Sequence, residues 1–442
     1  MLSGLARDGG LYVPDAFPQL SRNDLLALRG KPFAEVAFAI AQRFAGGSIP
    51  DTDLKRMVEA AYATFSHPAV TPLKQLDGNQ FLVELFHGPT LAFKDVAMQL
   101  LARLMDWSLV RRGQRATIVG ATSGDTGGAA IEAFQHSRQA SIFILHPHGR
   151  VSEVQRRQMT TVLAPTVHNI AIEGSFDDCQ AIIKDLFNDL VFRDDVNLAG
   201  VNSINWARVM AQISYYVYAA LNLGGPDRSV SFTVPTGNFG NVFAGYAAKR
   251  MGLAIDRLVV ATNSNDILDR CLKSGRYEIM GVHETTSPSM DIQVSSNFER
   301  LLYFANGCSA ETVVRQMQNL KQSNGFTLDA AALAAIGAEF DSGATREDAV
   351  DATIAQVLGA TGELLDPHTA VGYAVARQTA TASPMVTFAT AHPAKFPDAV
   401  ERASGFRPAL PSRLSHLMNA RESFTVLPNK AEAVKEHILA RR

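Results

Sequence analysis

One lysine, Lys94, follows an apolar strand and a Gly-Pro break, at a point where its amine could become a nucleophile. Residues 81–86 are apolar except for Glu84, and a helical pattern of apolar residues begins at Phe93. The positive end of a helix dipole and apolar neighbours both disfavour an ammonium ion, so we expect a lowered pKa for this amine. A neutral amine can attack an aldehyde. An exposed lysine lying along an apolar helix would fit the same stretch.

Two glycine-rich turns each follow a predicted strand and precede a predicted helix, which is where α/β sheets bind anions. The first turn, residues 120–128, offers hydroxyls and backbone N–H groups that could bind a carboxylate or a phosphate. The second, residues 236–241, has glycines and asparagines that would let backbone N–H groups surround a phosphate. Either turn could instead be a tight connection whose hydroxyls cap the next helix.

A third candidate, Thr390, lies at the end of a predicted strand over residues 385–389. The carboxyl ends of strands carry ligand groups in α/β sheets. A nicotinamide cofactor is excluded, because the glycines do not follow the spacing G-x-G-x-x-G and residues 145–147 offer no acidic group for a ribose.

Composition restricts the function classes further. The 442 residues are 47% hydrophobic and 19% charged, with a formal net charge of -2. This balance is that of a folded soluble protein and gives no support for nucleic acid or an anionic membrane as a partner. The three cysteines lack metal-ligand spacing, so we expect no metal site and a reducing, cytoplasmic location. We find no apolar run of the roughly 20 residues that a membrane span needs.

The order of elements predicts an α/β fold. Residues up to about 72 are predicted to be mostly helical. Beyond residue 80, short apolar strands alternate with helices, which favours parallel sheets covered by helices on both faces. The predicted strands cover residues 81–86, 116–120, 141–145, 167–172, 231–234, 258–261 and 385–389.

Several longer motifs resemble one enzyme family. HGPTLAFKD at 87–95, TSGDTG at 122–127, NSINWAR at 202–208, GNFGN at 237–241 and TAHPAKF at 390–396 are similar to threonine synthases of the microbial and fungal type. These are pyridoxal-phosphate enzymes of fold type II. The resemblance implies two parallel-sheet domains covered by helices, like the tryptophan synthase β fold. It also implies an N-terminal helical domain at 1–75 and a catalytic unit at 76–442, with a smaller subdomain near 100–225.

The same resemblance implies roles for individual residues. Lys94 would be the catalytic residue and would bond covalently to the aldehyde of pyridoxal 5'-phosphate. Thr390 would meet the pyridine nitrogen. The cofactor phosphate would be bound by Gly237, Asn238, Phe239, Gly240 and Asn241. The substrate would be bound by Thr122, Ser123, Asp125 and Thr126 at its amino-acid end, and by Ser203, Asn205 and Arg208 at its phosphate end.

The implied reaction converts O-phospho-L-homoserine and water to L-threonine and phosphate, by a monomer without a nucleic-acid or membrane partner. A phospholyase or dehydratase releasing 2-oxobutyrate, or a noncatalytic binding protein, would share these motifs. Two features depart from the pattern. Many fold type II enzymes have asparagine at the position of Asp125, so this carboxyl must be protonated, turn away or face a second cation. A Ser-Thr-Arg-Gly segment usual near the start is also missing, so we expect the start to be truncated.

Overall fold

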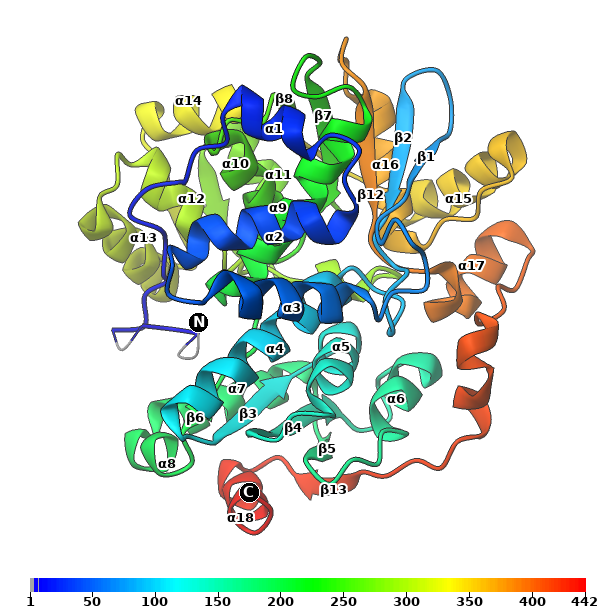
Figure 1. The fold of residues 1–442 in the computed structure, drawn as a ribbon. Helices are drawn as coiled ribbons and strands as arrows, with labels where there is room; N and C mark the ends of the chain where they lie inside the picture. The colour runs from blue at the N-terminus through cyan, green and yellow to red at the C-terminus, as the bar shows by residue number, and fades with distance from the viewer. Residues whose placement is uncertain (1–3, 7) are drawn as a thin grey trace.

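Two separate β-sheets form the frame of the molecule (Figure 1). The computed structural model describes residues 4–6 and 8–442, so the expectation of a truncated start concerns residues outside those described. The larger sheet has the order β1-β2-β12-β7-β8-β11, and only the β1–β2 pair is antiparallel. Its strands are β1 (Leu73–Gln75), β2 (Gln80–Glu84), β7 (Val230–Pro235), β8 (Ile255–Thr262), β11 (Phe340–Ala344) and β12 (Met385–Ala389).

The smaller sheet has the order β13-β5-β4-β3-β6 and is parallel throughout. Every residue of its strand β4 is buried, as expected for a parallel sheet with helices on both faces. The strands are β3 (Ala116–Ala121), β4 (Ala140–Pro147), β5 (Val167–Glu173), β6 (Leu198–Ala199) and β13 (Thr425–Pro428). A separate antiparallel pair joins β9 (Arg276–Glu278) to β10 (Gly325–Thr327).

Helices cover both faces of each sheet. Apolar residues of α9 and α10 pack on one face of the larger sheet, and those of α15 and α16 pack on the other. The smaller sheet lies between α4 and α5 on one side and α7 and α18 on the other. The helices of the first half are α1 (Arg22–Leu28), α2 (Phe33–Ala45), α3 (Asp51–Tyr62), α4 (Lys94–Arg112), α5 (Asp125–Phe134), α6 (Glu153–Thr160), α7 (Phe176–Asn188), α8 (Leu190–Asp195) and α9 (Trp206–Asn222).

The second half continues the same alternation. Its α-helices are α10 (Gly240–Arg250), α11 (Ile267–Ser274), α12 (Phe298–Ala305), α13 (Ala310–Ser323), α14 (Ala330–Glu339), α15 (Glu347–Thr361), α16 (Pro367–Gln378), α17 (Pro397–Ser404) and α18 (Ala431–Leu439). The described part of the chain also has the 3-10 helices η1 (Pro288–Met290), η2 (Pro393–Lys395) and η3 (Ser412–Asn419). Within the described residues, no helix is long and apolar enough to cross a membrane.

The predicted α/β class is confirmed, and the bounds of each predicted strand lie within three residues of those of an observed strand. The N-terminal helices were also expected. Helix α1 begins at a capping box in which the hydroxyl of Ser21 accepts a hydrogen bond from the backbone of Asp24. Phe33 and Ile40 of α2 and Val58 of α3 share one apolar core with α9 and the larger sheet. The domain boundary at residue 75 stays a prediction.

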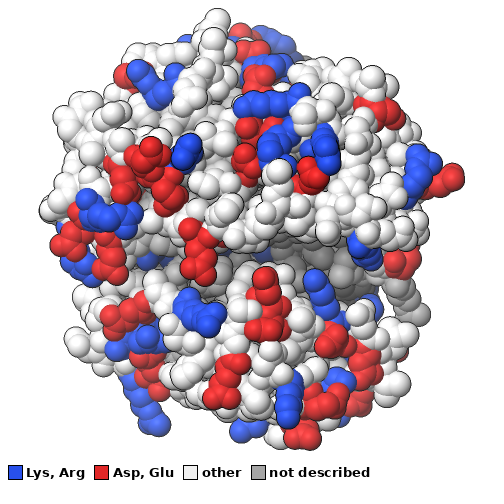
Figure 2. All heavy atoms as spheres, turned by 180° about the vertical axis from the view of Figure 1, so that it is seen from behind, with Lys and Arg blue, Asp and Glu red and all other residues white. Residues whose placement is uncertain are grey.

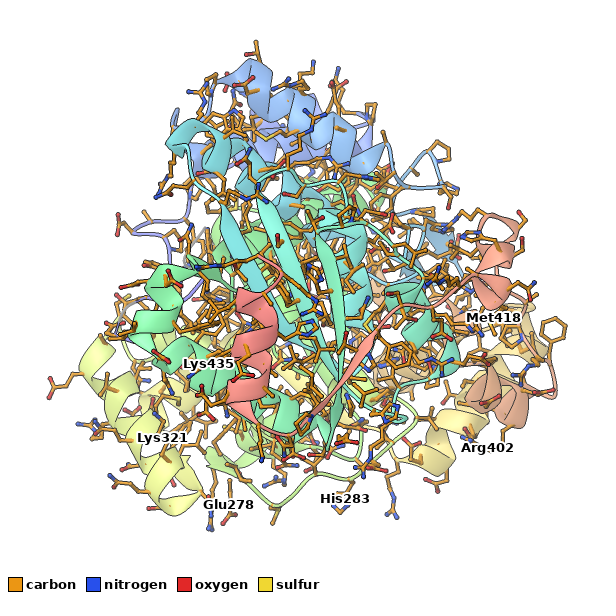
Figure 3. All side chains as sticks on the ribbon, turned by 90° about the horizontal axis from the view of Figure 1, so that it is seen from below. Glu278, His283, Lys321, Arg402, Met418 and Lys435 are labelled. Atoms are coloured by element: carbon orange, nitrogen blue, oxygen red, sulfur yellow. The ribbon has the colours of Figure 1, made fainter. Side chains whose placement is uncertain are left out.

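The C-terminal segment connects the two sheets (Figure 1). It leaves α17 beside the larger sheet, passes through η3, adds β13 to the edge of the smaller sheet and ends in α18. Figure 3 shows α18, which carries Lys435, lying across the smaller sheet. Lys435 Nζ contacts the Asp189 carboxylate at 2.8 Å. No strand was predicted beyond residue 389, so strand β13 is an addition to the predicted fold.

Glu422 attaches this segment to helix α6. Its carboxylate accepts hydrogen bonds from Arg156 Nε at 2.8 Å, Arg156 Nη2 at 3.0 Å and Thr160 Oγ1 at 2.7 Å. The hydrogen bonds from Arg156 lower the pKa of Glu422 to about 2. Bidentate arginine–carboxylate pairs are among the stronger charged contacts in proteins.

Replacing Glu422 with glutamine should therefore lower the free energy of unfolding by about 1–3 kcal/mol at neutral pH. Because the pKa is lowered in the folded state, this contribution is complete above the unfolded value of 4.5 and is lost as the pH falls toward about 2. Urea denaturation of both proteins across this range would measure the difference.

Glu432→Gln is the matched control, since Glu432 is an exposed partner of Lys435 and should contribute less than about 1 kcal/mol. Equal and pH-independent effects of the two substitutions would contradict the assigned role of Glu422.

Candidate active site

A cavity lies where the carboxyl ends of strands β7 and β12 approach the first turn of helix α4. This is the edge at which parallel sheets bind ligands. Figure 2 shows a hollow at mid-height on the face opposite to that of Figure 1. The cavity is lined by Phe93, Lys94, Thr126, Ser203, Arg208, Gln212, Gly237, Asn238, Phe239, Gly240, Asn241, Ser289, Met290, His368 and Thr390, among others.

Lys94 is the first residue of helix α4 and is only 7% exposed. Its Nζ atom lies 3.3 Å from Asp125 Oδ2 and 3.3 Å from Ser289 Oγ. Burial lowers the pKa of Lys94 and outweighs the opposing effect of the Asp125 carboxylate. The lowered pKa expected from the sequence is therefore confirmed, with burial as its main cause.

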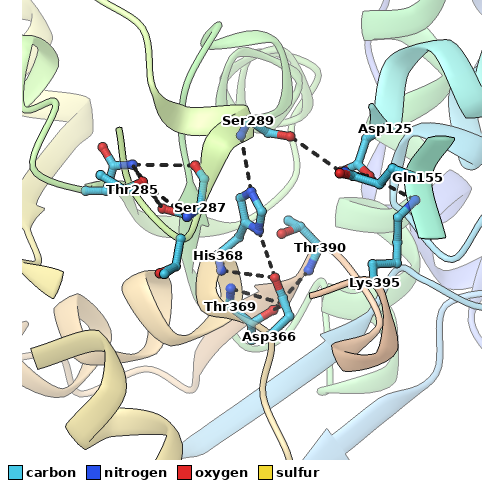
Figure 4. A network of polar contacts seen from close by, with 12 residues as sticks. Asp125, Gln155, Thr285, Ser287, Ser289, Asp366, His368, Thr369, Thr390 and Lys395 are labelled. Carbon is cyan, nitrogen blue, oxygen red and sulfur yellow. Dashed lines mark hydrogen bonds and ion pairs between the residues drawn. The ribbon is translucent and has the colours of Figure 1, made fainter. Parts of the chain in front are cut away.

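Asp125, the first residue of helix α5, contacts a second lysine, Lys395, which was not among the predicted site residues. Lys395 Nζ lies 2.8 Å from Asp125 Oδ1, and Gln155 Nε2 donates to the same oxygen at 2.9 Å. Burial alone would raise the pKa of Asp125, but the charges of Lys395 and Lys94 hold it well below its usual range. Asp125 is therefore a carboxylate that faces a second cation, which was one of the three possibilities (Figure 4).

The turn from Gly237 to Asn241 presents its backbone N–H groups at the start of helix α10. A Cβ atom on Gly237 would lie 2.6 Å from the Ser289 carbonyl oxygen, so a side chain cannot be accommodated there. Ser295 Oγ donates to the Gly237 carbonyl and Asn297 Nδ2 donates to the Asn238 carbonyl. With these carbonyls already paired, the N–H groups of the first helical turn, which have no partner within the helix, are available to an anion.

Phe239 and Asn241 fix the shape of this turn. Phe239 adopts a left-handed backbone conformation with φ of 62°, and its buried ring packs against Phe298 and Phe340. Asn241 Oδ1 accepts hydrogen bonds from the hydroxyls of Tyr215 and Tyr216. The side-chain nitrogen of Asn241, Nδ2, is buried and has no hydrogen-bond partner within the described part of the chain.

Thr390 follows strand β12 and is 5% exposed. Its backbone N–H donates to Thr369 Oγ1, which also contacts Asp366. Asp366 Oδ1 lies 2.9 Å from His368 Nδ1, and His368 Nε2 accepts a hydrogen bond from the Ser289 N–H. Figure 4 shows this chain of contacts, which supports Thr390 from below and leads across Ser289 to Asp125.

Three residues expected at the phosphate end of a substrate occupy different environments. Ser203 and Arg208 line the cavity. The Asn205 side chain instead accepts a hydrogen bond from the backbone of Ala207 and caps helix α9. Burial lowers the pKa of Arg208 to about 10, and its Nε atom has no hydrogen-bond partner among the described residues. Arg208 therefore brings a positive charge and a free donor to the cavity.

The predicted substrate-binding residues of the hydroxyl-rich turn 120–128 also occupy different environments. The Thr122 hydroxyl is buried and accepts hydrogen bonds from the N–H groups of Gly124 and Gly127, so it shapes the turn. Ser123 and Thr126 are half-buried, and Thr126 lines the cavity.

These residues fit a ligand that bears both a phosphate and an aldehyde. Two buried donors, Arg208 Nε and Asn241 Nδ2, lack partners in the described structure at a cavity that also receives helix N–H groups. The absence of space for a side chain at Gly237 permits close approach to the backbone. Lys94 supplies a buried amine in the same cavity. An anion and an electrophilic carbon can therefore be bound together.

Lys395, Gln155, Ser289 and His368 were not predicted as site residues. Lys395 belongs to the motif at 390–396, so the sequence offered a signal for this residue. Nothing in the spacing relates Lys395 to Asp125, since the two lie far apart in the chain and meet only through folding.

Comparisons with known proteins agree over the whole chain. Residues 65–355 match the family described as pyridoxal-phosphate dependent enzyme, and residues 1–62 and 369–438 match the threonine synthase N terminus and C-terminal families. Threonine synthase from Pseudomonas aeruginosa is 52% identical over 441 residues, covering 99% of this chain and 94% of that protein.

Two solved structures extend the comparison to the fold. The crystal structure of pyridoxal-phosphate-bound threonine synthase from Brucella melitensis is 60% identical with a TM-score of 0.97, and that of the yeast threonine synthase is 40% identical with a TM-score of 0.93. Each alignment covers 99% of this chain and 95% of the other. The chain belongs to the threonine synthase family of pyridoxal-phosphate-dependent enzymes.

Proposed function

We propose that this enzyme converts O-phospho-L-homoserine and water to L-threonine and inorganic phosphate. One observation carries the proposal: the buried amine of Lys94 lines the same cavity as the glycine-rich turn 237–241 and Arg208. The cavity offers a nucleophilic amine and two kinds of hydrogen-bond donor that can bind phosphate, namely backbone N–H groups and a guanidinium. It therefore suits both the cofactor and a phosphorylated amino acid.

The cofactor would be bound by residues from three elements. Lys94 would bond to its aldehyde carbon, and the N–H groups of residues 237–241 would bind its phosphate. The hydroxyl of Thr390 would face the pyridine nitrogen. Because a hydroxyl does not hold a proton there as a carboxylate would, the geometry of the site must guide the chemistry as well.

When bound, pyridoxal phosphate accepts the electrons released as a proton leaves the carbon beside the substrate's amino group. Lys94 would serve as the base that takes up that proton. Ser123, Asp125 and Thr126 would orient the amino-acid end of the substrate. Arg208 and Ser203 would bind its phosphate, which is a far better leaving group than hydroxide, and water would then be added to the β-carbon.

Several properties follow as parts of the same proposal. The fold is of type II among pyridoxal-phosphate enzymes, with a smaller subdomain near residues 100–225. The enzyme is a cytoplasmic monomer with no nucleic-acid partner. Three unpaired cysteines support the location, and interspersed acidic and basic side chains on the face in Figure 2 support the partner assignment.

A single incubation tests the reaction. Purified protein with pyridoxal phosphate and O-phospho-L-homoserine should release L-threonine and inorganic phosphate in equal amounts. Release of phosphate with 2-oxobutyrate would identify a phospholyase instead, and absence of phosphate would reject the substrate.

Replacing Lys94 with alanine should abolish the absorbance of lysine-bound cofactor and reduce turnover at least about 10³-fold, since both the covalent attachment and the base are lost. Absorbance spectra and the coupled phosphate assay would measure both effects. Lys55→Ala, at an exposed lysine of helix α3 that does not line the cavity, should change neither. Substantial turnover by the Lys94→Ala protein would reject the mechanism.

Replacing Arg208 with glutamine should raise the KM for O-phospho-L-homoserine by about 10- to 100-fold, as expected for the loss of a charged hydrogen bond to phosphate. Cofactor affinity, measured by equilibrium titration, should change less than about threefold. A loss confined to cofactor affinity would instead assign Arg208 to the cofactor phosphate.

A further inference from the structure

One buried carboxylate, that of Asp125, lies between two buried lysines. Lys94 and Lys395 approach different oxygens of the carboxylate, and both side chains are almost fully removed from solvent. A single negative charge cannot fully compensate two ammonium ions in a medium of low dielectric constant. One of the two lysines must therefore give up its proton more readily than the other.

The contacts distinguish the two lysines. Lys395 Nζ lies 2.8 Å from Asp125 Oδ1 and donates to the Thr90 carbonyl at 2.7 Å, and its side chain is 0% exposed. Lys94 Nζ has longer contacts, 3.3 Å to Asp125 Oδ2 and 3.3 Å to the Ser289 hydroxyl. The ammonium form is thus better stabilised at Lys395, which has two short contacts to oxygen.

We propose that Lys395 is a positioning residue that binds the negative charge of Asp125 and so leaves the Lys94 amine neutral and able to attack an aldehyde. The Asp125–Lys395 pair then carries no net charge. This explains how a carboxylate can stand where related enzymes carry a neutral asparagine. The inference rests on the proposed function in one respect, the attack of Lys94 on the cofactor aldehyde.

Among the described residues, the other charged groups around Lys94 do not supply a competing carboxylate. Asp95, on the same helix, accepts hydrogen bonds from the Thr90 N–H at 2.8 Å and the Thr90 hydroxyl at 2.7 Å. Asp366 is paired with His368. Arg208 adds a further positive charge, which together with Lys395 lowers the pKa of Lys94 after the larger effect of burial. The groups that face Lys94 from packed elements are Asp125 of α5, Arg208 of α9, His368 of α16 and Lys395 of η2.

Which of the two lysines balances the charge of Asp125 decides whether the Lys94 amine is available for catalysis. Were Asp125 paired with Lys94, the carboxylate would stabilise the ammonium form and the amine would be unavailable at neutral pH. A neutral amine can add to the aldehyde carbon, and one water leaves as the new carbon–nitrogen double bond forms. Capture of the cofactor by the chain therefore reports the protonation of Lys94 directly.

The test measures the rate at which the full chain, stripped of cofactor, captures pyridoxal phosphate between about pH 6 and pH 10. Trapping with borohydride and mass spectrometry of the Lys94 peptide would quantify capture. For the unaltered chain we expect a midpoint well below the ordinary lysine value of about 10.4. Lys395→Met should move the midpoint up by at least about one pH unit and slow capture at neutral pH about tenfold, because Asp125 then pairs with Lys94.

The double variant Asp125→Asn with Lys395→Met separates an electrostatic role from a structural one. Removing the carboxylate as well should return capture at neutral pH to within about threefold of the unaltered chain. A Lys395→Met protein that folds and keeps the original midpoint would overturn the proposal, and so would a double variant that is not restored. If Lys395→Met does not fold, the test is the pH midpoint of cofactor capture by the unaltered chain. A midpoint at the ordinary lysine value would overturn the proposal.

Lys94→Ala keeps this inference distinct from the proposed function. The Lys94→Ala chain should not capture the cofactor at this position at any pH. Capture by that variant at an unchanged rate would reject the covalent role of Lys94. Capture at Lys94 with no dependence on Lys395 would reject only the assigned role of Lys395.

Discussion

A short backbone pairing between residues 91–93 and 390–392 fixes the geometry of the whole site. The Phe93 N–H donates to the Thr390 carbonyl at 2.8 Å, the His392 N–H donates to the Leu91 carbonyl at 3.0 Å, and Ala92 pairs with Ala391. Through these bonds the first turn of helix α4 is fixed to the end of strand β12. Lys94, Thr390 and Lys395 are thereby set relative to one another before any side chain contributes.

In this paired segment Leu91 adopts a left-handed backbone conformation with φ of 62°, which is uncommon for a residue other than glycine. Burial compensates, since Leu91 is 1% exposed and Ala92 is 0% exposed. Strain of this kind persists only where the surrounding structure dictates it, and it is concentrated at functional sites. The rigid segment is consistent with a site whose chemistry depends on the placement of one amine.

Side chains from distant parts of the chain donate hydrogen bonds to backbone carbonyls of the loop just before this segment. The Thr90 carbonyl accepts hydrogen bonds from both Lys395 and Gln158. The C-terminal segment reaches the same loop, where Arg413 donates to the Gly88 carbonyl at 3.0 Å. Residues that connect the two sheets therefore also hold the loop before Lys94. The smaller sheet, the larger sheet and the C-terminal segment meet at one short stretch of chain.

The sequence by itself determined the α/β class, most strand positions and the beginning of helix α4 near Lys94, because periodicity, β-branched runs and glycine turns act locally. It also indicated Lys94, the turn at 237–241 and Thr390 as candidates, since each stands at the end of a predicted element. Only the tertiary structure decided the partner of Asp125 and the capping role of Asn205. Strand β13 was likewise not predictable, because a short edge strand forms only when the chain returns to β5. Contacts of this kind depend on how distant elements pack, and no local pattern records them.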